Sequence, residues 1–367
     1  MNKKKIAIFV SDEGYGHIVR QRALISKLLI FKKKIKITIF SGKKISILKN
    51  KFKKLVSYKK INKTLGTLKD KDGNLNVLGT KKNFNDWAKN KGKWMIAHKK
   101  IFEKYDIFIS DFMPEVFELS NRLEKKSYGI AHFTWDWFYK KIYGQDTTYK
   151  QLLSYIQKAD KIFFPPFTNK EIINKYKKKI INVNFFLSDF KKKPYKKSAN
   201  KKCLIMDNGN RTMTRHIERS LKKLTKIDHV DFTLRKDFLS KKSKKIIKKS
   251  KNLRGISGLK RTHEFIMESD FIIARGGFNT ISECLVLKKP SLLFNETSNP
   301  EIKENLKMIN NEKKCSLISS KDFENNIEKR INFFIKNEFL KLRKNLNKSK
   351  YKSNGAEQVA NFIIKNL

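Results

Sequence analysis

The chain has 367 residues, of which 39% are hydrophobic, and a formal net charge of +51 at pH 7. This length exceeds that of one compact core of ordinary size, so two domains are expected. The cysteines Cys203, Cys284 and Cys315 are odd in number and lack paired spacing, which argues against a disulfide framework and a zinc ribbon. A reducing, cytoplasmic location is expected.

The positive charge of the chain suggests nucleic acid or an anionic membrane as a partner. The basic residues are mostly lysine and lie along the whole chain, together with many Asn, Ile and Phe. This distribution indicates a general residue bias rather than a selected patch, and arginine, which suits base and phosphate contacts, is scarce. Nucleic acid is therefore not expected as the main target, whereas an anionic or membrane-held acceptor stays open.

No targeting or membrane-spanning segment is expected. The apolar run at residues 6–10 is short and is followed by Asp12 and Glu13, which excludes a secretory signal. No run of about 18 apolar residues occurs, so no transmembrane helix is predicted. The charge is compatible with a peripheral position at the inner face of the membrane.

In the first half, short apolar runs alternate with amphipathic segments, a pattern typical of a parallel sheet covered by helices on both faces. A helix is predicted at residues 18–31, where a lysine run closes the last turn. Strands are predicted at residues 6–10, 35–40, 107–110 and 128–132. Residues 186–202 are polar and aperiodic, which predicts a linker.

The second half repeats this α/β alternation, and the lysine-rich stretch 241–251 is interpreted as a solvated helix face. A final amphipathic helix is predicted from Gly355. Strands are predicted at residues 203–206, 230–234, 271–274 and 291–294, and helices at 262–269, 280–287 and 302–310. Two such halves imply a cleft between them, and ligands of these sheets bind at the carboxyl ends of the strands.

The stretch IIARGGFNTISEC is the main candidate for a ligand loop. Gly276 and Gly277 follow a buried strand and permit a tight turn, and Thr280 is predicted to begin the next helix. A helix start offers N–H groups to a phosphate, and Glu283 is placed one turn later to accept hydrogen bonds from ribose hydroxyls. Residues 280–283 also form a T-x-x-E capping box, which closes a helix without a ligand, so both interpretations stay open.

The segment SDEGYGHIVR also joins a strand to a helix. Its G-x-G-x-x-G pattern fails because Val19 replaces the third glycine, which argues against a dinucleotide site. The segment places His17 between Gly14 and Gly16 at a helix start, with Arg20 one turn on. Histidine is suited to take a proton near neutral pH. The alternative is a histidine that caps its own loop.

Asp111 ends a predicted strand in YDIFISDFMPE, where an orienting partner for His17 would have to lie. In the following segment HFTWDWFY, Trp135 and Trp137 either stack on a sugar or pack the wall of the cleft, and packing is expected for at least one of them. Asp136 either bonds a hydroxyl or caps a turn.

Several site classes lack their signatures. No G-x-x-x-x-G-K-[ST], H-E-x-x-H or G-x-S-x-G motif occurs, so P-loop, zincin and serine-hydrolase interpretations have no support. No clear cluster of metal ligands is present either, and neither a metal nor a cofactor is expected.

The pairing of GYGHIVR with ARGGFNTISE resembles the nucleotide-sugar glycosyltransferases of the GT-B fold. Within them it is similar to the group of the transferase that adds N-acetylglucosamine to lipid-linked muramyl pentapeptide. ISDFMPE and FTWDWFY are similar to the glycosyltransferase-like domain fused to arabinokinases. The resemblance implies two Rossmann-like α/β domains facing across a cleft: an acceptor domain at 1–185, a linker at 186–202, a nucleotide-sugar domain at 203–354 and a helix at 355–367 that packs back towards the first domain.

The resemblance also implies residue roles. His17 is expected to be the general base, with Asp111 as its partner. The acceptor or cleft side is expected to include Gly14, Gly16, Arg20, Trp135 and Asp136. The donor diphosphate is assigned to Gly276, Gly277, Asn279 and Thr280, the ribose to Glu283, and the donor sugar to Glu304 and Asn305 in a loop where the family usually has Gln. Asn208 and Gly209 match the family's glycine-rich first loop only loosely.

The implied reaction is direct displacement at the anomeric carbon of a nucleoside-diphosphate sugar, with uridine as the expected nucleoside and backbone donors in place of a metal. Cell-envelope polysaccharide is the expected product. A nucleotide-sugar hydrolase on the same fold carries a similar G-x-G-H-x-x-R-like loop, with water replacing the acceptor. A non-catalytic nucleotide-sugar-binding protein and a basic nucleic-acid binder are further hypotheses.

Overall fold

The computed structural model describes residues 2–42, 45–61, 65–187, 198–207, 212–258, 262–295 and 297–367. The chain divides into two compact units. The N-terminal unit comprises Met1–Leu68, Leu75–Ser188 and Lys352–Leu367, and the C-terminal unit comprises Lys69–Asn74 and Asp189–Tyr351. Most of the predicted linker at 186–202, namely residues 188–197, lies outside the described residues.

A parallel seven-stranded sheet forms the middle of the N-terminal unit, in the order β3-β2-β1-β4-β5-β6-β7. The four strands predicted for this half are confirmed as β1, β2, β4 and β5. The strands are β1 Lys4–Val10, β2 Ile35–Ser41, β3 Ser57–Lys60, β4 Ile107–Ser110, β5 Lys126–Ile130, β6 Lys161–Phe164 and β7 Ile180–Asn182.

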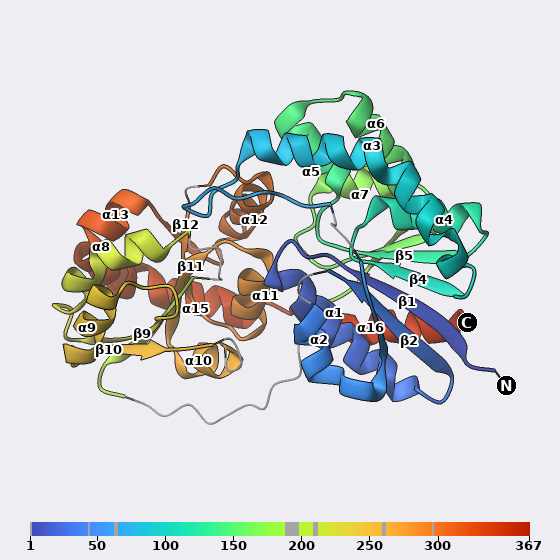
Figure 1. Cartoon of the computed structure of the whole chain (residues 1–367). Coiled ribbons are helices and arrows are strands. Elements are labelled where there is room, and N and C mark those ends of the chain that lie inside the picture. The colour runs from blue at the N-terminus through green and yellow to red at the C-terminus, as the bar shows by residue number, and fades with distance from the viewer. Residues whose placement is uncertain are drawn as a thin grey trace. The chain divides into compact units, whose positions relative to one another are not determined.

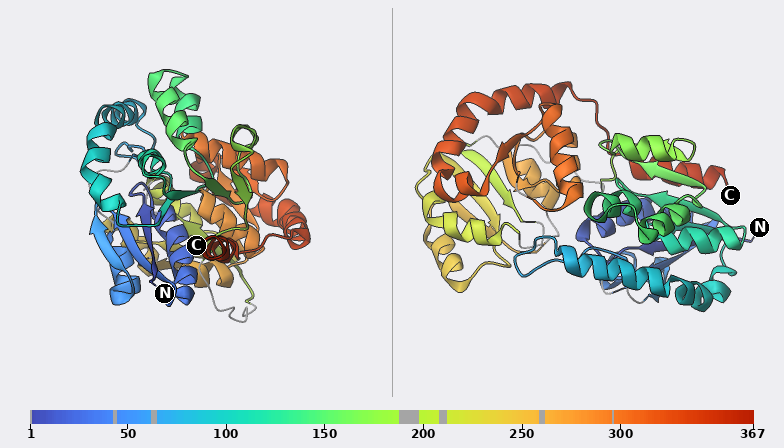
Figure 2. Two further views of the ribbon diagram at one scale, coloured as in Figure 1. Left: turned by 90° about the vertical axis from the view of Figure 1, so that its right-hand side faces the viewer. Right: turned by 90° about the horizontal axis from the view of Figure 1, so that it is seen from above.

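Helices cover both faces of this sheet (Figures 1 and 2). One face carries α1 Tyr15–Leu28, α2 Ile45–Phe52 and α16 Gly355–Lys365. The other carries α3 Val77–Phe102, α4 Pro114–Arg122, α5 Trp135–Tyr143, α6 Thr147–Ile156 and α7 Lys170–Tyr176. Along β1, Ile6 and Ile8 face the first layer while Ala7 and Phe9 face the second, which explains the unbroken apolar run.

The C-terminal helix α16 packs against α1 and completes the first layer of the N-terminal unit. Its start is fixed by a close backbone approach. A Cβ on Gly355 would lie 1.9 Å from the carbonyl oxygen of Asn184, and the N–H of Gly355 donates to the carbonyl of Phe185 at 3.0 Å. Only glycine fits here, so this residue ties the last helix to the segment after β7.

The C-terminal unit has a parallel six-stranded sheet in the order β10-β9-β8-β11-β12-β13. Its strands are β8 Lys201–Met206, β9 Val230–Arg235, β10 Leu253–Ile256, β11 Phe271–Arg275, β12 Ser291–Phe294 and β13 Ser316–Ile318. The helices are α8 Thr214–Leu224, α9 Lys241–Lys249, α10 Thr262–Glu268, α11 Phe278–Val286, α12 Pro300–Asn311, α13 Ser320–Asn325, α14 Ile327–Phe333 and α15 Phe339–Lys348.

In each sheet the strand order reverses beside the first strand, between β1 and β4 and between β8 and β11. Parallel sheets with such a reversal leave a crevice at the carboxyl ends of the two strands, where ligands bind. The prediction of two Rossmann-like α/β domains is confirmed. These two reversal points are therefore the places to look for function.

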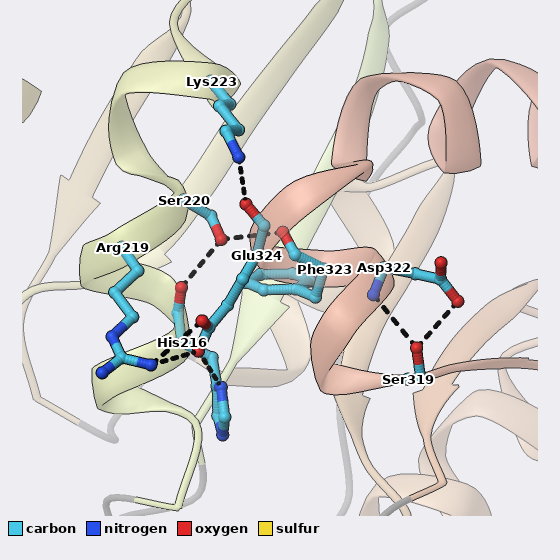
Figure 3. A network of polar contacts seen from close by, with 8 residues as sticks. All are labelled: His216, Arg219, Ser220, Lys223, Ser319, Asp322, Phe323 and Glu324. Atoms are coloured by element: carbon cyan, nitrogen blue, oxygen red, sulfur yellow. Dashed lines mark hydrogen bonds and ion pairs between the residues drawn. The ribbon is translucent and has the colours of Figure 1, made fainter.

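A polar network joins α8 to α13 in the C-terminal unit (Figure 3). Nδ1 of His216 lies 2.6 Å from Oε1 of Glu324, and NH1 of Arg219 donates to both carboxylate oxygens at 3.1 and 3.0 Å. Nζ of Lys223 donates to the carbonyl of Glu324 at 2.5 Å. Lys223 thus satisfies a carbonyl in the last turn of the short helix α13, while His216 and Arg219 hold the Glu324 side chain, so the network stabilises the packing of two helices.

The longest helix was not predicted. It is α3, with 26 residues, and it lies between the predicted strands at 35–40 and 107–110. Trp87 and Phe102 are among its buried residues, while lysines cover its outer side. Within the described ranges, no helix is both long and apolar enough to cross a membrane.

Candidate active site

His17 and Asp111 meet at the carboxyl edge of the N-terminal sheet. His17 lies in the first turn of α1, for which Gly14 is the N-cap, and Asp111 follows β4, the neighbour of β1. Nδ1 of His17 lies 2.7 Å from Oδ2 of Asp111. The aspartate side chain is fully buried, whereas that of His17 is 14% exposed. The structure thus brings together the two residues predicted as base and partner.

Arg20 is the third member of this cluster. Its NH2 donates to Oδ1 of Asp111 at 2.5 Å and lies 3.2 Å from Nδ1 of His17. A single Nδ1 cannot both donate to Asp111 and accept from Arg20, and the shorter contact at 2.7 Å favours the carboxylate. The proton of neutral His17 therefore sits on Nδ1, which leaves Nε2 with its lone pair.

Arg20 and His17 decide the ionisation state of Asp111. Burial alone would raise the pKa of this carboxyl, but the two neighbouring basic groups and their hydrogen bonds hold its pKa well below the usual range. Asp111 is therefore a carboxylate at neutral pH. The residue after it, Phe112, has a φ of 60°, which is uncommon for an aromatic residue, and such backbone strain gathers at functional sites.

His132 joins the cluster, although no site role was predicted for it. NH1 of Arg20 lies 3.2 Å from Nδ1 of His132, at the carboxyl end of β5. Arginine only donates, so Nδ1 of His132 must accept and its proton lies on Nε2. The position of this histidine at the end of a predicted strand was the only available signal, because the contact depends on how α1 crosses the sheet.

The loop between β1 and α1 has a further support. Oε1 of Glu13 accepts hydrogen bonds from both the N–H of Thr67, at 3.2 Å, and its hydroxyl. A Cβ on Gly42 would lie 1.8 Å from Oδ2 of Asp12, so the end of β2 also approaches this loop closely. Gly16 is half-buried in the first turn of α1, beside His17.

Two residues assigned to the acceptor side lie in the core. Trp135 is buried, with its ring edge-on to Phe84 and Phe133 at 5.6 and 5.2 Å between centroids. Asp136 is also buried and accepts a hydrogen bond from Nζ of Lys175 at 2.8 Å. This placement favours packing for Trp135 and an ion pair for Asp136 over contact with an acceptor. Trp137 is likewise buried.

The glycine-rich stretch connects β11 to α11. Helix α11 begins at Phe278, two positions before the predicted start, because Gly277 is the N-cap. Thr280 lies inside the first turn and is buried, so the capping-box interpretation, in which Thr280 caps the helix, is wrong. A Cβ on Gly276 would lie 2.5 Å from Cδ2 of Leu306, so the glycine lets α12 pack against the turn.

The residues predicted to read the donor lie along α11 and α12. Asn279 is the second residue of α11, and Glu283, buried one turn later, has Oε1 at 2.9 Å from Nε2 of His263 in α10. Glu304 is half-buried on α12. Asn305 is buried, with Nδ2 at 3.4 Å from Oε1 of Glu301.

The first loop of the C-terminal unit follows β8. The predicted residues Asn208 and Gly209 lie outside the described residues. Just before them, Asp207 is buried at the end of β8 and accepts a hydrogen bond from the hydroxyl of Thr214 at 2.7 Å. Burial raises the pKa of Asp207, although the Thr214 hydroxyl and the charge of Arg275 oppose the shift.

The C-terminal unit contains a cavity, but the described residues offer no metal site. The described ranges contain no group of three or more His, Cys, Asp or Glu side chains that could hold a metal ion. A cavity of about 580 Å³ lies at the starts of β8, β9 and β10, with Lys202, Arg254 and Glu268 in its wall. It is at the amino end of the sheet, away from the reversal point and from α11.

Two parallel Rossmann-like sheets, each with its own reversal point, define the GT-B class of glycosyltransferase folds. Three solved structures share the fold. They are the glycotransferase of kitacinnamycin (TM-score 0.70, 12% identity, 100% of both chains covered), UGT2 of Phytolacca americana complexed with UDP-2-fluoroglucose and pterostilbene (0.67, 13%, 100% of this chain and 99% of that one), and MurG of Acinetobacter baumannii (0.64, 11%, 99% of both).

One sequence family is more specific than the fold class. Residues 208–361 match the model of the glycosyltransferase family 28 C-terminal domain. The chain thus has the GT-B fold, and its residues 208–361 match a glycosyltransferase family 28 C-terminal domain. This stretch includes the glycine turn and all of α11 and α12. No curated protein sequence matches the chain.

Proposed function

We propose that this protein moves a sugar from a nucleoside-diphosphate sugar, with UDP as the nucleotide, to a hydroxyl of an acceptor, with His17 as general base and without a metal ion. The observation that carries the proposal is the contact between His17 and the buried carboxylate of Asp111. The family 28 domain and the UDP-sugar bound to the similar UGT2 structure support the donor class.

The N-terminal unit supplies the proton acceptor. Asp111 holds the proton of His17 on Nδ1, so the lone pair of Nε2 can take the proton of an acceptor hydroxyl. As that proton moves, the acceptor oxygen forms a bond to the anomeric carbon of the sugar. Asp111 then stabilises the imidazolium, because its carboxylate is kept ionised by Arg20.

The C-terminal unit stabilises the leaving group. The bond between the anomeric carbon and the phosphate oxygen breaks, and its electron pair leaves with the nucleoside diphosphate. The start of α11 lies at the reversal point of the sheet, with Gly277 as an N-cap that has no side chain. A helix N-terminus attracts phosphate through its dipole and backbone N–H groups, which supports a reaction without metal.

Binding and turnover of UDP-sugars test this function. We expect saturable binding of one UDP-sugar by calorimetry and release of UDP when hydroxylated acceptors are added. His17→Ala should lower turnover by about 10²- to 10⁴-fold and leave donor affinity unchanged. His98→Ala is the matched control, because His98 lies in the same unit, donates to the backbone carbonyl of Trp94 and stacks on its ring, away from Asp111.

The outcomes separate the parts of the proposal. Undiminished turnover in His17→Ala would exclude the base, and loss of activity in EDTA would exclude metal independence. Absence of any UDP-sugar binding would exclude the donor class. Donor binding without turnover of any acceptor, and without any effect of His17→Ala, would identify a non-catalytic nucleotide-sugar-binding protein.

Hydrolysis is the second candidate, because a histidine oriented by a carboxylate activates water as readily as a sugar hydroxyl. Free sugar released in the absence of an acceptor would establish this reaction. The acceptor itself is proposed to be anionic or membrane-held, since a net charge of +51 attracts such partners. Activity that is indifferent to salt and to acidic lipid vesicles would rule this acceptor class out.

A further inference from the structure

We propose that His132 is a positioning residue, which holds the guanidinium of Arg20 in the one orientation that leaves Nδ1 of His17 to the carboxylate of Asp111. The inference rests on the proposed function only in taking His17 as the base. His132 lies two residues after β5, and Asp111 directly follows β4, the neighbouring strand. Both residues therefore lie at the carboxyl edge of one sheet.

Arg20 is held at two points of its planar group. NH2 donates to Oδ1 of Asp111 at 2.5 Å, and NH1 donates to Nδ1 of His132 at 3.2 Å. The Nε–H group is buried and has no hydrogen-bond partner in the described part of the chain. Because the arginine side chain is only 3% exposed, loss of His132 would leave a second N–H group unpaired in the interior.

One other acceptor lies within reach of the guanidinium. Nδ1 of His17 is 3.2 Å from NH2 of Arg20, and the same nitrogen is 2.7 Å from Oδ2 of Asp111. A guanidinium only donates, so a hydrogen bond from Arg20 to this nitrogen needs its lone pair and moves the proton of neutral His17 to Nε2. Nε2 could then no longer take the proton of a hydroxyl. Arg20 and Asp111 thus compete for one nitrogen.

His132 decides this competition in favour of the carboxylate. Two contacts fix the plane of a rigid guanidinium, whereas a single contact leaves it free to turn. His132 itself is well fixed, since it is 7% exposed and its ring lies edge-on to Phe133 at 5.0 Å between centroids. Without the acceptor on His132, Arg20 can turn towards His17, and the base loses its lone pair on Nε2.

The tautomer of His17 measures this role without any substrate. Proton–nitrogen correlation spectra of the full chain with isotope-labelled histidine distinguish a proton on Nδ1 from one on Nε2, and His17→Ala identifies the signals of His17. Neutral His17 of the wild type should favour Nδ1–H by about tenfold or more, as expected for a hydrogen bond to a charged acceptor. In His132→Phe, which keeps a ring without an acceptor, this ratio should fall by about tenfold or more.

Turnover supplies a second measurement. In His132→Phe, kcat should fall by about twofold to tenfold, in step with the fraction of His17 whose Nε2 is unprotonated, while KM for the donor stays unchanged. His132→Asn should restore both the tautomer ratio and kcat, because its side-chain oxygen can accept from Arg20 near the place of Nδ1. Rescue by this variant separates the acceptor from the general packing of the ring.

Thr134→Val is the matched control. Thr134 is buried in the same segment, and its hydroxyl has no hydrogen-bond partner among the described residues. This variant should keep the wild-type tautomer ratio. His132→Leu is a second variant without an acceptor, in case His132→Phe does not fold, and circular dichroism shows which variants are folded.

Three results would overturn the inference. An unchanged tautomer ratio in folded His132→Phe or His132→Leu would remove His132 from the control of His17. An equal fall of the ratio in His132→Asn would mean that the ring, and not its acceptor, is decisive. A wild-type His17 with its proton on Nε2 would refute the arrangement itself. Absence of turnover with every UDP-sugar would refute the proposed function alone, because the tautomer ratio would still decide the role of His132.

Discussion

Replacing Arg20 by methionine should destabilise the N-terminal unit strongly. Arg20 and Asp111 are both buried, and the arginine is the permanent positive charge that balances the carboxylate. Removing one partner of a buried ion pair leaves an uncompensated charge, which costs about 3–5 kcal/mol. With a urea m-value of about 2 kcal/mol/M, the unfolding midpoint should fall by roughly 2 M at pH 7.

The loss should depend on pH. In the wild type the folded-state pKa of Asp111 is depressed, so the carboxylate contributes stability above its unfolded pKa of about 3.9, and this contribution is lost as the pH falls through the folded pKa. In Arg20→Met, burial without arginine raises the pKa of Asp111, so protonation relieves the penalty at acid pH. The difference between variant and wild type should therefore be largest at pH 7 and smaller at pH 4.

Tryptophan fluorescence reports on the N-terminal unit alone. The four tryptophans of the chain, Trp87, Trp94, Trp135 and Trp137, all belong to that unit. Urea titrations at pH 4 and pH 7 followed by this signal therefore measure the free energy of unfolding of the unit that holds Arg20. They are not complicated by a separate transition of the C-terminal unit.

A double variant supplies the decisive control. Arg20→Met/Asp111→Asn removes both charges and should be more stable than Arg20→Met, because no buried charge remains uncompensated. The reasoning is refuted if Arg20→Met costs less than about 1 kcal/mol, the range of an exposed pair. It is also refuted if the cost is the same at both pH values, or if the separately measured costs of Arg20→Met and Asp111→Asn simply add in the double variant.

Three further outcomes follow from packing and burial. Lys175→Met leaves the buried carboxylate of Asp136 without its partner and should cost about 3 kcal/mol by tryptophan fluorescence, whereas a change within error would show that the carboxylate finds another donor. Gly276→Ala places a methyl group against Leu306 and should cost about 1–3 kcal/mol by circular dichroism, and the added change Leu306→Ala should cost less in this background than in the wild type. The cysteines Cys203, Cys284 and Cys315 are buried, and burial raises the pKa of their thiols, that of Cys315 to about 12. Ellman's reagent should therefore modify none of the three until urea unfolds the chain. Fast modification of the native protein would contradict this.

The fold could be predicted from sequence because its central strands are buried on both faces. Unbroken apolar runs such as residues 271–274 are distinctive, and all eight predicted strands lie in the two sheets. The edge strands were not predicted. In β3, Ser57–Lys60, one residue is half-buried and the other three are exposed, so its sequence has no apolar run to recognise. Edge strands are set by their neighbour in the sheet rather than by their own composition.

The site was predictable only in its first members. His17 and Asp111 follow strands that are adjacent in the sheet, so a topology argument suffices to bring them together. The contacts of His132 and His263 depend on which side chains a helix turns inward and on how the helices pack, and a single sequence does not carry that information. Trp135 and Asp136 are the opposite case. Their motif suggested contact with a sugar, but in the structure both side chains are buried against residues of α3 and α7.

The sequence His-Ile-x-Arg occurs in the first turn of α1 and again in that of α8, and in both places the histidine and the arginine contact one carboxylate. Burial separates the two sets. Arg219 is 48% exposed and Glu324 19% exposed, so water screens their pair, which then contributes little beyond holding two helices together. Arg20 and Asp111 are buried, so solvent screens their pair less, and the arginine fixes the ionisation of the carboxylate and, through it, the proton of His17. The same four-residue pattern therefore links two helices at the surface and fixes the orientation of a histidine beside a buried carboxylate.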